Sequence, residues 1–292
     1  TWQTVIWDCG SAPDSTNNVL ISDGTMVNIT AGSTESVLNL TIDDPTGSLL
    51  LDPNSTLIVK GDLDVQAADG LSMADGSRII FRGVNGDQII SNATGSAISF
   101  ANLEVDNIAG VTLNSGNYEI SENLDLLRGN FSNNGVLTFL STSSNTAAIG
   151  ATPNNNIIDG TGSFKAQRFR STRNTNWGDI ASSGVDTDLE DLNGEVLMSG
   201  IAGGNGYATQ TGGGVFTSIY FWNESTNLYE VPASTSEPFE IGRGYEIWLG
   251  SNQTTWNDQA WELEGDIDLS PISISVSSVS YTHLTLPTTP YV

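Results

Sequence analysis

The densest acidic stretch of the chain spans residues 186–195 and reads DTDLEDLNGE. Asp186, Asp188 and Glu190 alternate within it, and oxygen ligands at alternating positions suit Ca²⁺. The spacing of an EF-hand loop fails, because Asp191 stands where the turn glycine is required and Leu197 stands at the twelfth position. The stretch is therefore interpreted as a solvated loop. Ca²⁺ is the only cofactor for which the sequence offers candidate ligands.

Two arginines invite comparison with a lyase, in which an Arg base acts beside Ca²⁺-binding carboxylates. Arg78 and Arg82 share one face of a predicted strand by parity. No dense Asp cluster stands beside them in the neighbouring apolar triplets. Paired carboxylates for glycoside hydrolysis need a defined separation in space, which sequence does not give. We therefore assign no catalytic residue.

Aromatic side chains offer a second kind of chemistry, the stacking of sugar rings. Trp256 and Trp261 lie among polar residues and are expected to be exposed, and Tyr229 joins them as a glycan-binding candidate. Trp248 and Tyr220 lie within alternating strands, so they are expected to pack in a core.

Arg168 and Arg170 form a basic cluster around Phe169. A strand would place both arginines on one exposed face. We expect them to pair with acidic loops of the preceding region and so fix a domain junction. A site for acidic glycans is the alternative interpretation.

Composition narrows the classes of partner. The 292 residues hold 9 Lys and Arg against 34 Asp and Glu, a formal charge of −25, which repels nucleic acids and anionic membrane surfaces. No apolar run approaches the ~18 residues of a membrane helix. The only Cys, Cys9, cannot form an internal disulfide, and a Ser-His-Asp triad would have to use the only His, His283. Packing and backbone hydrogen bonds must stabilise the fold.

Between residues 37 and 140 the sequence is a series of short apolar triplets separated by Gly, Asn, Asp or Ser. Their starts recur about every 7–8 residues, and alternation within each triplet indicates a strand with one buried face. Three steps give about 22 residues, the length of one coil in a three-sided solenoid. The pattern predicts an all-β fold with a right-handed parallel β-helix; an antiparallel sandwich is the alternative.

The coil length also predicts the register. The triplets that begin at Ile79, Leu103 and Leu124 should stack in one sheet, about 4.8 Å apart. Glu104 and Asp125 would then point outward, one above the other, where Arg82 could relieve their repulsion. We expect these charges to be solvated.

From Phe164 the composition shifts towards Trp and longer alternating strands, typical of an antiparallel β-sandwich that we expect to be truncated. Residues 186–194 and 200–214 are predicted to be its long loops. We expect a cap with entry strands at residues 1–36, a β-helix at 37–150 and a linker at 151–163. An incomplete sandwich-like domain at 164–270 and a non-native or disordered tail at 271–292 should follow.

Several sequence motifs resemble those of the large secreted and cell-surface β-helix proteins of Bacteroidota that are associated with type IX secretion. These motifs are Trp7-Asp8-Cys9-Gly10, the Gly-x-Leu-x-Val at 61–65, residues 135–150, Gln167-Arg168-Phe169 with Trp177, and Gly242-Arg243-Gly244-Tyr245. The resemblance spans most of residues 7–265. It implies an extracellular or outer-surface location and a role as an adhesin, surface-layer component or non-catalytic region of a larger protein.

The last residues, from about Val279, resemble a translated sequencing adapter. On that interpretation the natural sequence stops earlier and His283 belongs to the added segment.

These observations favour a non-catalytic extracellular scaffold or adhesion segment of a larger exported bacterial surface protein. A carbohydrate-active module, either glycan-binding or lyase-like, is the alternative. Expected partners are extracellular glycans or cell-surface components, with neither nucleic acid nor membrane insertion.

Overall fold

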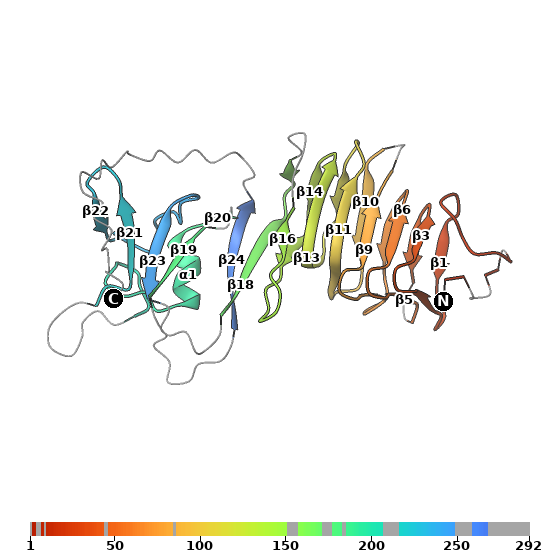
Figure 1. Ribbon diagram of the computed structural model, residues 1–292, viewed down its shortest axis with the longest axis horizontal. Coiled ribbons are helices and arrows are strands. Elements are labelled where there is room, and N and C mark those ends of the chain that lie inside the picture. The colour runs from red at the N-terminus through yellow and green to blue at the C-terminus, as the bar shows by residue number, and fades with distance from the viewer. Residues whose placement is uncertain are drawn as a thin grey trace, which may run out of the picture.

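The computed structural model describes residues 2–3, 7–8, 10–43, 46–83, 86–150, 157–170, 177–182, 185–206, 216–248 and 259–267. The predicted tail from Val279 and the candidate Trp256 lie outside these residues. The described chain is nearly all β, with a parallel β-solenoid followed by an antiparallel region (Figure 1).

Parallel strands stack along three sides of the solenoid. The first side holds seven strands in the order β1 (Val19–Ile21), β4 (Leu40–Ile42), β7 (Leu63–Val65), β10 (Gln88–Asn92), β12 (Val111–Leu113), β14 (Phe131–Asn133) and β17 (Ile158–Asp159). The second holds β2 (Met26–Ile29), β5 (Ser48–Leu51) and β8 (Leu71–Met73). The expected linker at 151–163 therefore contributes β17, a strand that extends the first side.

The third side is the longest sheet. Its order is β20 (Val185–Asp186), β24 (Gln259–Ile267), β18 (Ser163–Arg170), β15 (Val136–Phe139), β13 (Asn117–Arg128), β11 (Ala97–Asp106), β9 (Arg78–Phe81), β6 (Thr56–Val59) and β3 (Thr34–Val37), with β16 (Ala148–Ile149) beside β13. The long strands β11 and β13 shift register between Phe100 and Asn102. Their two halves therefore pair with different neighbours, the first half of β13 with β15 and the second with β16.

The predicted stack is confirmed. Leu103 of β11 pairs in register with Ile79 of β9 and with Leu124 of β13. All three side chains are fully buried in one continuous core. Because each strand alternates, every second residue joins a column of like apolar side chains in the interior, and its neighbours face outward.

The turn between the second and third sides repeats from coil to coil. Gly32, Asn54 and Gly76 each adopt a positive φ at the equivalent position, a conformation that glycine and asparagine tolerate best. Serine follows each of them. The hydroxyl groups of Ser55 and Ser77 donate to the carbonyl three residues earlier, which closes the turn.

A buried amide pair fixes the chain just after β9. Gln88 donates to the carbonyls of Val59, at 3.1 Å, and Gly61. Its side-chain oxygen accepts from the Gly83 amide at 2.6 Å and from Asn107 at 3.2 Å. Satisfied buried amides of this kind specify one register, since an unpaired one would be costly. They hold the backbone that carries Arg82.

The C-terminal region has its own core. A four-stranded antiparallel sheet of β19 (Trp177–Ala181), β23 (Gly244–Trp248), β21 (Ile219–Asn223) and β22 (Leu228–Glu230) packs with the helix α1 (Leu189–Glu195) and one face of β24. This arrangement is β-sandwich-like. The predicted loop at 186–194 is wrong for most of its length: Asp188 caps α1 by accepting from the Glu190 amide at 2.9 Å.

Strand β18 belongs to both regions. Its residues Ser163–Ala166 pair in parallel with β15, and Phe164–Arg170 pair antiparallel with β24. The predicted domain start at Phe164 thus falls inside a strand of the solenoid sheet. The inner face of that sheet continues from Phe164 in the solenoid core to Leu263 and Trp261 in the second core.

Replacing Leu103 with alanine tests the stack. Its side chain is fully buried between two coils, so the cavity should lower the free energy of unfolding by about 2–5 kcal/mol. Ile108→Ala removes the same number of carbons from a largely exposed turn and should change it by less than about 0.5 kcal/mol. Urea denaturation followed by circular dichroism measures both; equal losses would contradict the register.

Candidate functional site

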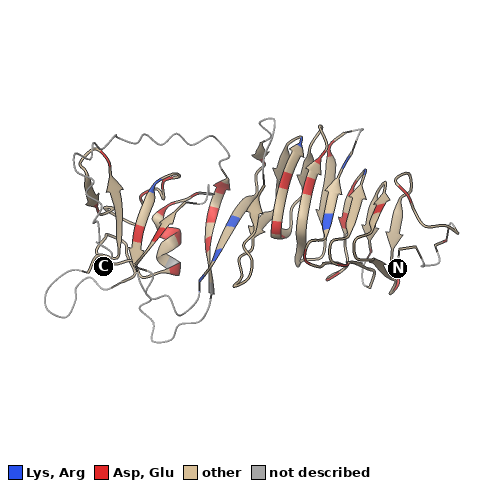
Figure 2. Ribbon diagram, in the orientation of Figure 1, with Lys and Arg blue, Asp and Glu red and all other residues tan. Residues whose placement is uncertain are grey.

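Charged side chains form a network on the outer face of the third side, at β9, β11 and β13. Figure 2 marks the acidic and basic positions along these strands. Arg78 donates to Glu104 at 2.9 Å. Arg82 donates to Asp106 at 2.7 Å and lies 3.8 Å from Glu104. Arg128 donates to the other oxygen of Asp106.

The acids lie beneath the arginines in this network. The side chains of Glu104 and Asp106 are only 6% and 12% exposed, whereas those of Arg78, Arg82 and Arg128 are 40%, 37% and 56% exposed. The expectation that Glu104 is solvated is therefore wrong, because two guanidinium groups cover its carboxylate.

The pairing shifts the protonation equilibria of two members. Burial alone would raise the pKa of Asp106, but hydrogen bonds from Arg128 and Arg82 outweigh it and lower that pKa. The hydrogen bond to Asp106 in turn raises the pKa of Arg128. Each side chain thus stabilises the charged form of the other.

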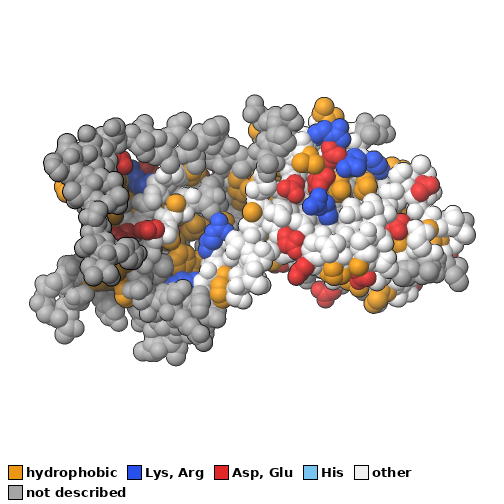
Figure 3. Space-filling model, viewed as in Figure 1, with side chains coloured by type: hydrophobic (Ala, Val, Ile, Leu, Met, Phe, Trp, Pro, Cys, Tyr) orange, Lys and Arg blue, Asp and Glu red, His pale blue; other side chains and the backbone are white. Residues whose placement is uncertain are grey.

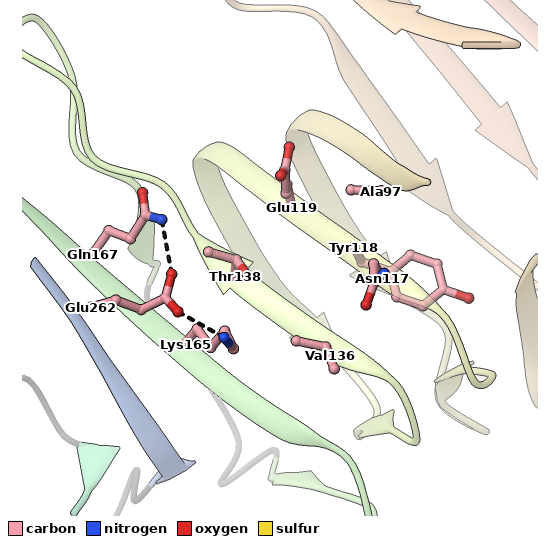
Figure 4. Close-up of a pocket in the computed structure, with 9 residues that line it drawn as sticks. All are labelled: Ala97, Asn117, Tyr118, Glu119, Val136, Thr138, Lys165, Gln167 and Glu262. Carbon is pink, nitrogen blue, oxygen red and sulfur yellow. Dashed lines mark hydrogen bonds and ion pairs between the residues drawn. The ribbon is translucent and has the colours of Figure 1, made fainter. Parts of the chain in front are cut away.

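A second polar site is a groove of about 270 Å³ on the outer face where the solenoid meets β24 (Figure 4). Glu262 of β24 lies between Lys165 and Gln167 of β18, which donate to its two oxygens at 2.7 Å and 3.0 Å. Glu119 and Thr138 line the solenoid side.

The groove also holds its charges as a pair. Burial alone would raise the pKa of Glu262, but hydrogen bonds from Gln167 and Lys165 lower it. The hydrogen bond to Glu262 raises the pKa of Lys165. A general acid or base needs a pKa near the working pH. These two shifts move the pKa values of Glu262 and Lys165 further from pH 7.

The acidic stretch does not assemble as a calcium site. Asp186 pairs through its backbone with Asp266 in β24, Asp188 caps α1, and Glu190 accepts from Asn193 at 3.1 Å. Within the described part of the chain, no group of three or more His, Cys, Asp or Glu side chains could hold a metal ion.

The aromatic candidates separate into two environments. The expected exposure of Trp261 is wrong: the side chain is 7% exposed, because β24 turns it into the second core. Tyr229 is 59% exposed and stands directly opposite Trp222, itself 38% exposed, across the hairpin of β21 and β22. The two ring centroids lie 5.2 Å apart.

Arg168 and Arg170 lie at the seam between β18 and β24, opposite Trp261 and Gln259. The Arg170 guanidinium lies 5.6 Å from the centre of the Trp261 ring. Burial lowers the pKa of Arg170, so its surroundings are partly dry. Arg170 therefore contacts an aromatic ring of β24 at the junction, and its expected pairing with acidic loops of the solenoid stays a prediction.

The sequence interpretation placed Arg82 near Glu104, as the structure does, but it missed Arg78 as a partner of Glu104 and missed the pairing of Asp106 with Arg82 and Arg128. The spacing contains the signal, since Arg82, Asp106 and Arg128 follow one another at about one coil length. The partnership of Lys165 with Glu262 has no such signal, because these residues come from strands far apart in the chain.

Comparison with protein-family models, with curated proteins and with solved structures finds no match for this chain. Among the described residues, no helix is long and apolar enough to cross a membrane.

Asp106 should make stability depend on pH at the acid end. Because its folded pKa is lowered, its contribution is present above about pH 4 and is lost as the pH falls through the folded pKa. Asp106→Asn should therefore cost about 1–2 kcal/mol at pH 7, and the cost should shrink towards pH 3.

Urea denaturation at pH 7 and pH 3 measures this difference. In the Arg128→Gln background, Asp106→Asn should cost less free energy of unfolding, and that cost should change less between the two pH values, because one partner of the carboxylate is already absent. A cost that is equal at both pH values would contradict the assignment of Asp106 as an ion-paired carboxylate.

Proposed function

We propose that this chain is a non-catalytic extracellular scaffold or adhesion segment of a larger exported bacterial surface protein. The observation that carries the proposal is the mutual pairing of charges on the outer face of the solenoid. Arg78, Arg82 and Arg128 each contact a carboxylate, and Lys165 contacts Glu262. These are structural ion pairs between strands, which hold side chains in one geometry.

A lyase-like role on the solenoid fits this pairing poorly. Arginine stays protonated in proteins, and a carboxylate beside it favours the charged form further. The hydrogen bond that raises the pKa of Arg128 illustrates the effect. A general base must be deprotonated before it can accept a proton from the substrate. The paired arginines are therefore better suited to stabilising the strand stack than to proton transfer.

The fold supports a spacer role. One apolar core extends from Trp2 near the N-terminus to Phe164, and the sheet then continues into the C-terminal region. Such stacks are quasi-one-dimensional and present long faces to partners. The formal charge of −25, the polar surface and the resemblance to Bacteroidota surface proteins support export, with type IX secretion as the proposed route.

A panel of neutral and acidic polysaccharides incubated with the purified chain tests the non-catalytic role. We expect no new reducing ends and no unsaturated products above the level of a heat-denatured sample. Release of either product at an enzymatic rate would overturn the proposal.

The hairpin of β21 and β22 favours a second candidate function, glycan binding. Trp222 and Tyr229 form an exposed cross-strand aromatic pair, and aromatic faces of this kind stack on the C–H groups of sugars. Asn223, Ser225 and Thr226 follow Trp222 at the turn, where the Ser225 hydroxyl donates to the Asn223 side chain at 2.7 Å and the Thr226 hydroxyl to the Asn223 carbonyl at 3.5 Å.

Alanine substitutions in the hairpin distinguish stacking from general stickiness. Tyr229→Ala and Trp222→Ala should each weaken binding to an insoluble neutral polysaccharide by about tenfold, roughly 1.4 kcal/mol. Leu228→Ala removes an equally exposed apolar side chain next to Tyr229 and should leave binding unchanged. Pull-down isotherms measure all three; wild-type binding by Tyr229→Ala would exclude this hairpin as the glycan contact.

A further inference from the structure

Positive charge gathers at one place on this acidic chain. Of the nine Lys and Arg residues, Lys60, Arg78, Arg82 and Arg128 lie on the outer face of the third side. Figure 3 shows Lys and Arg side chains grouped on the solenoid with acidic residues between them. Three of these residues mark a row at the carboxyl ends of the strands, which we call the cationic row: Lys60, Arg82 and Arg128.

The cationic row follows from the register. Val59, Phe81, Val105 and Leu126 stack in neighbouring strands, so Lys60, Arg82 and Asp106 occupy the next position in theirs. Arg128 pairs with Asp106 after a register shift. Strand spacing of about 4.8 Å places the ends of the row roughly 14 Å apart, along the axis of the stack.

The acids of this network are buried more deeply than its arginines, so the surface that faces solvent is mainly cationic. Glu104 and Asp106 are almost covered, whereas the arginines above them are more than one-third exposed. A guanidinium has five N–H donors, and Arg82 uses its Nε and one terminal nitrogen on the two acids. The buried carboxylates therefore orient the arginines while donors remain for a group in solution.

The carboxylates near the cationic row do not fully neutralise its positive charge. Glu122 and Asp125 lie on the same face, but Glu122 accepts from the Gly76 amide and from Asn102 at the amino ends of the strands. Asp106 lies within the row and Glu104 lies 3.8 Å from Arg82, so the three cations Lys60, Arg82 and Arg128 exceed these two carboxylates by one charge. The charge on the rest of the chain is screened beyond about 8 Å at physiological salt.

We propose that the cationic row binds an acidic glycan, whose carboxylate or sulfate groups lie along the stack of coils. The proposal rests on the adhesion role above and names the partner class. Guanidinium groups suit planar carboxylates and sulfates, which they bind through two parallel hydrogen bonds. The row spreads its three cations over ~14 Å. This spacing matches a glycan with widely spaced charges better than duplex DNA, which carries a charge every ~1.7 Å.

Binding of the full chain to polygalacturonate, dextran sulfate and neutral dextran tests the proposal. We expect binding to at least one acidic polymer at 20 mM NaCl, strong weakening at 500 mM NaCl, and none to dextran. The polygalacturonate and dextran sulfate arms distinguish carboxylate from sulfate recognition. Retention on duplex DNA as strong as on both acidic glycans would overturn the glycan assignment.

Two variants locate the site. Lys60→Glu leaves the ion pairs of Glu104 and Asp106 in place and should weaken binding by at least about fivefold; Arg128→Gln removes a second cation and should do the same. Arg243→Gln removes a cation that pairs with Glu240 in the C-terminal region and should leave binding unchanged. Circular dichroism confirms that each variant is folded.

The results separate this inference from the proposed function. Unchanged binding by Lys60→Glu, or no binding of either acidic polymer at 20 mM NaCl, would overturn the cationic row as a glycan site and leave the scaffold role standing. Cleavage of a bound acidic polymer would instead overturn the non-catalytic role.

Discussion

A stack of parallel coils ends in unpaired strand edges and an open apolar core, and both ends must be covered. At the N-terminal end the buried Trp2 joins the core and its amide donates to Asn28 at 2.6 Å, while Trp7 packs against its ring. At the other end β24 pairs antiparallel with β18. The rest of the described structure is arranged around this closure.

Closure by β24 links the two regions through one sheet. Its inner face carries Trp261 and Leu263 into the second core, and its outer face carries Glu262 into the groove beside Lys165. The same strand thus completes the solenoid, supplies a wall of the sandwich-like region and neutralises a cation of β18. The C-terminal region is in this sense the cap of the solenoid as well as a unit with its own core.

The sequence predicted what is local and periodic. The stack of Ile79, Leu103 and Leu124 followed from the coil length, because apolar alternation fixes which face is buried and the repeat fixes which coil lies next. Side-chain partners were harder. The burial of Glu104 depends on how two arginines fold over it, and the burial of Trp261 depends on a strand pairing across about ninety residues, which no short pattern encodes. The acidic stretch formed a helix because Asp188 caps it and Leu189 and Leu192 reach a core that the sequence did not locate.

Hydrogen–deuterium exchange of β24 tests the closure most directly. If β24 completes the solenoid sheet, its amides should exchange at rates close to those of β13, roughly a hundredfold or more slower than the exposed hairpin turn at residues 224–227. Rapid exchange of β24 while β13 and β15 remain protected would show that the solenoid ends at β18. That result would contradict the shared sheet on which this account depends.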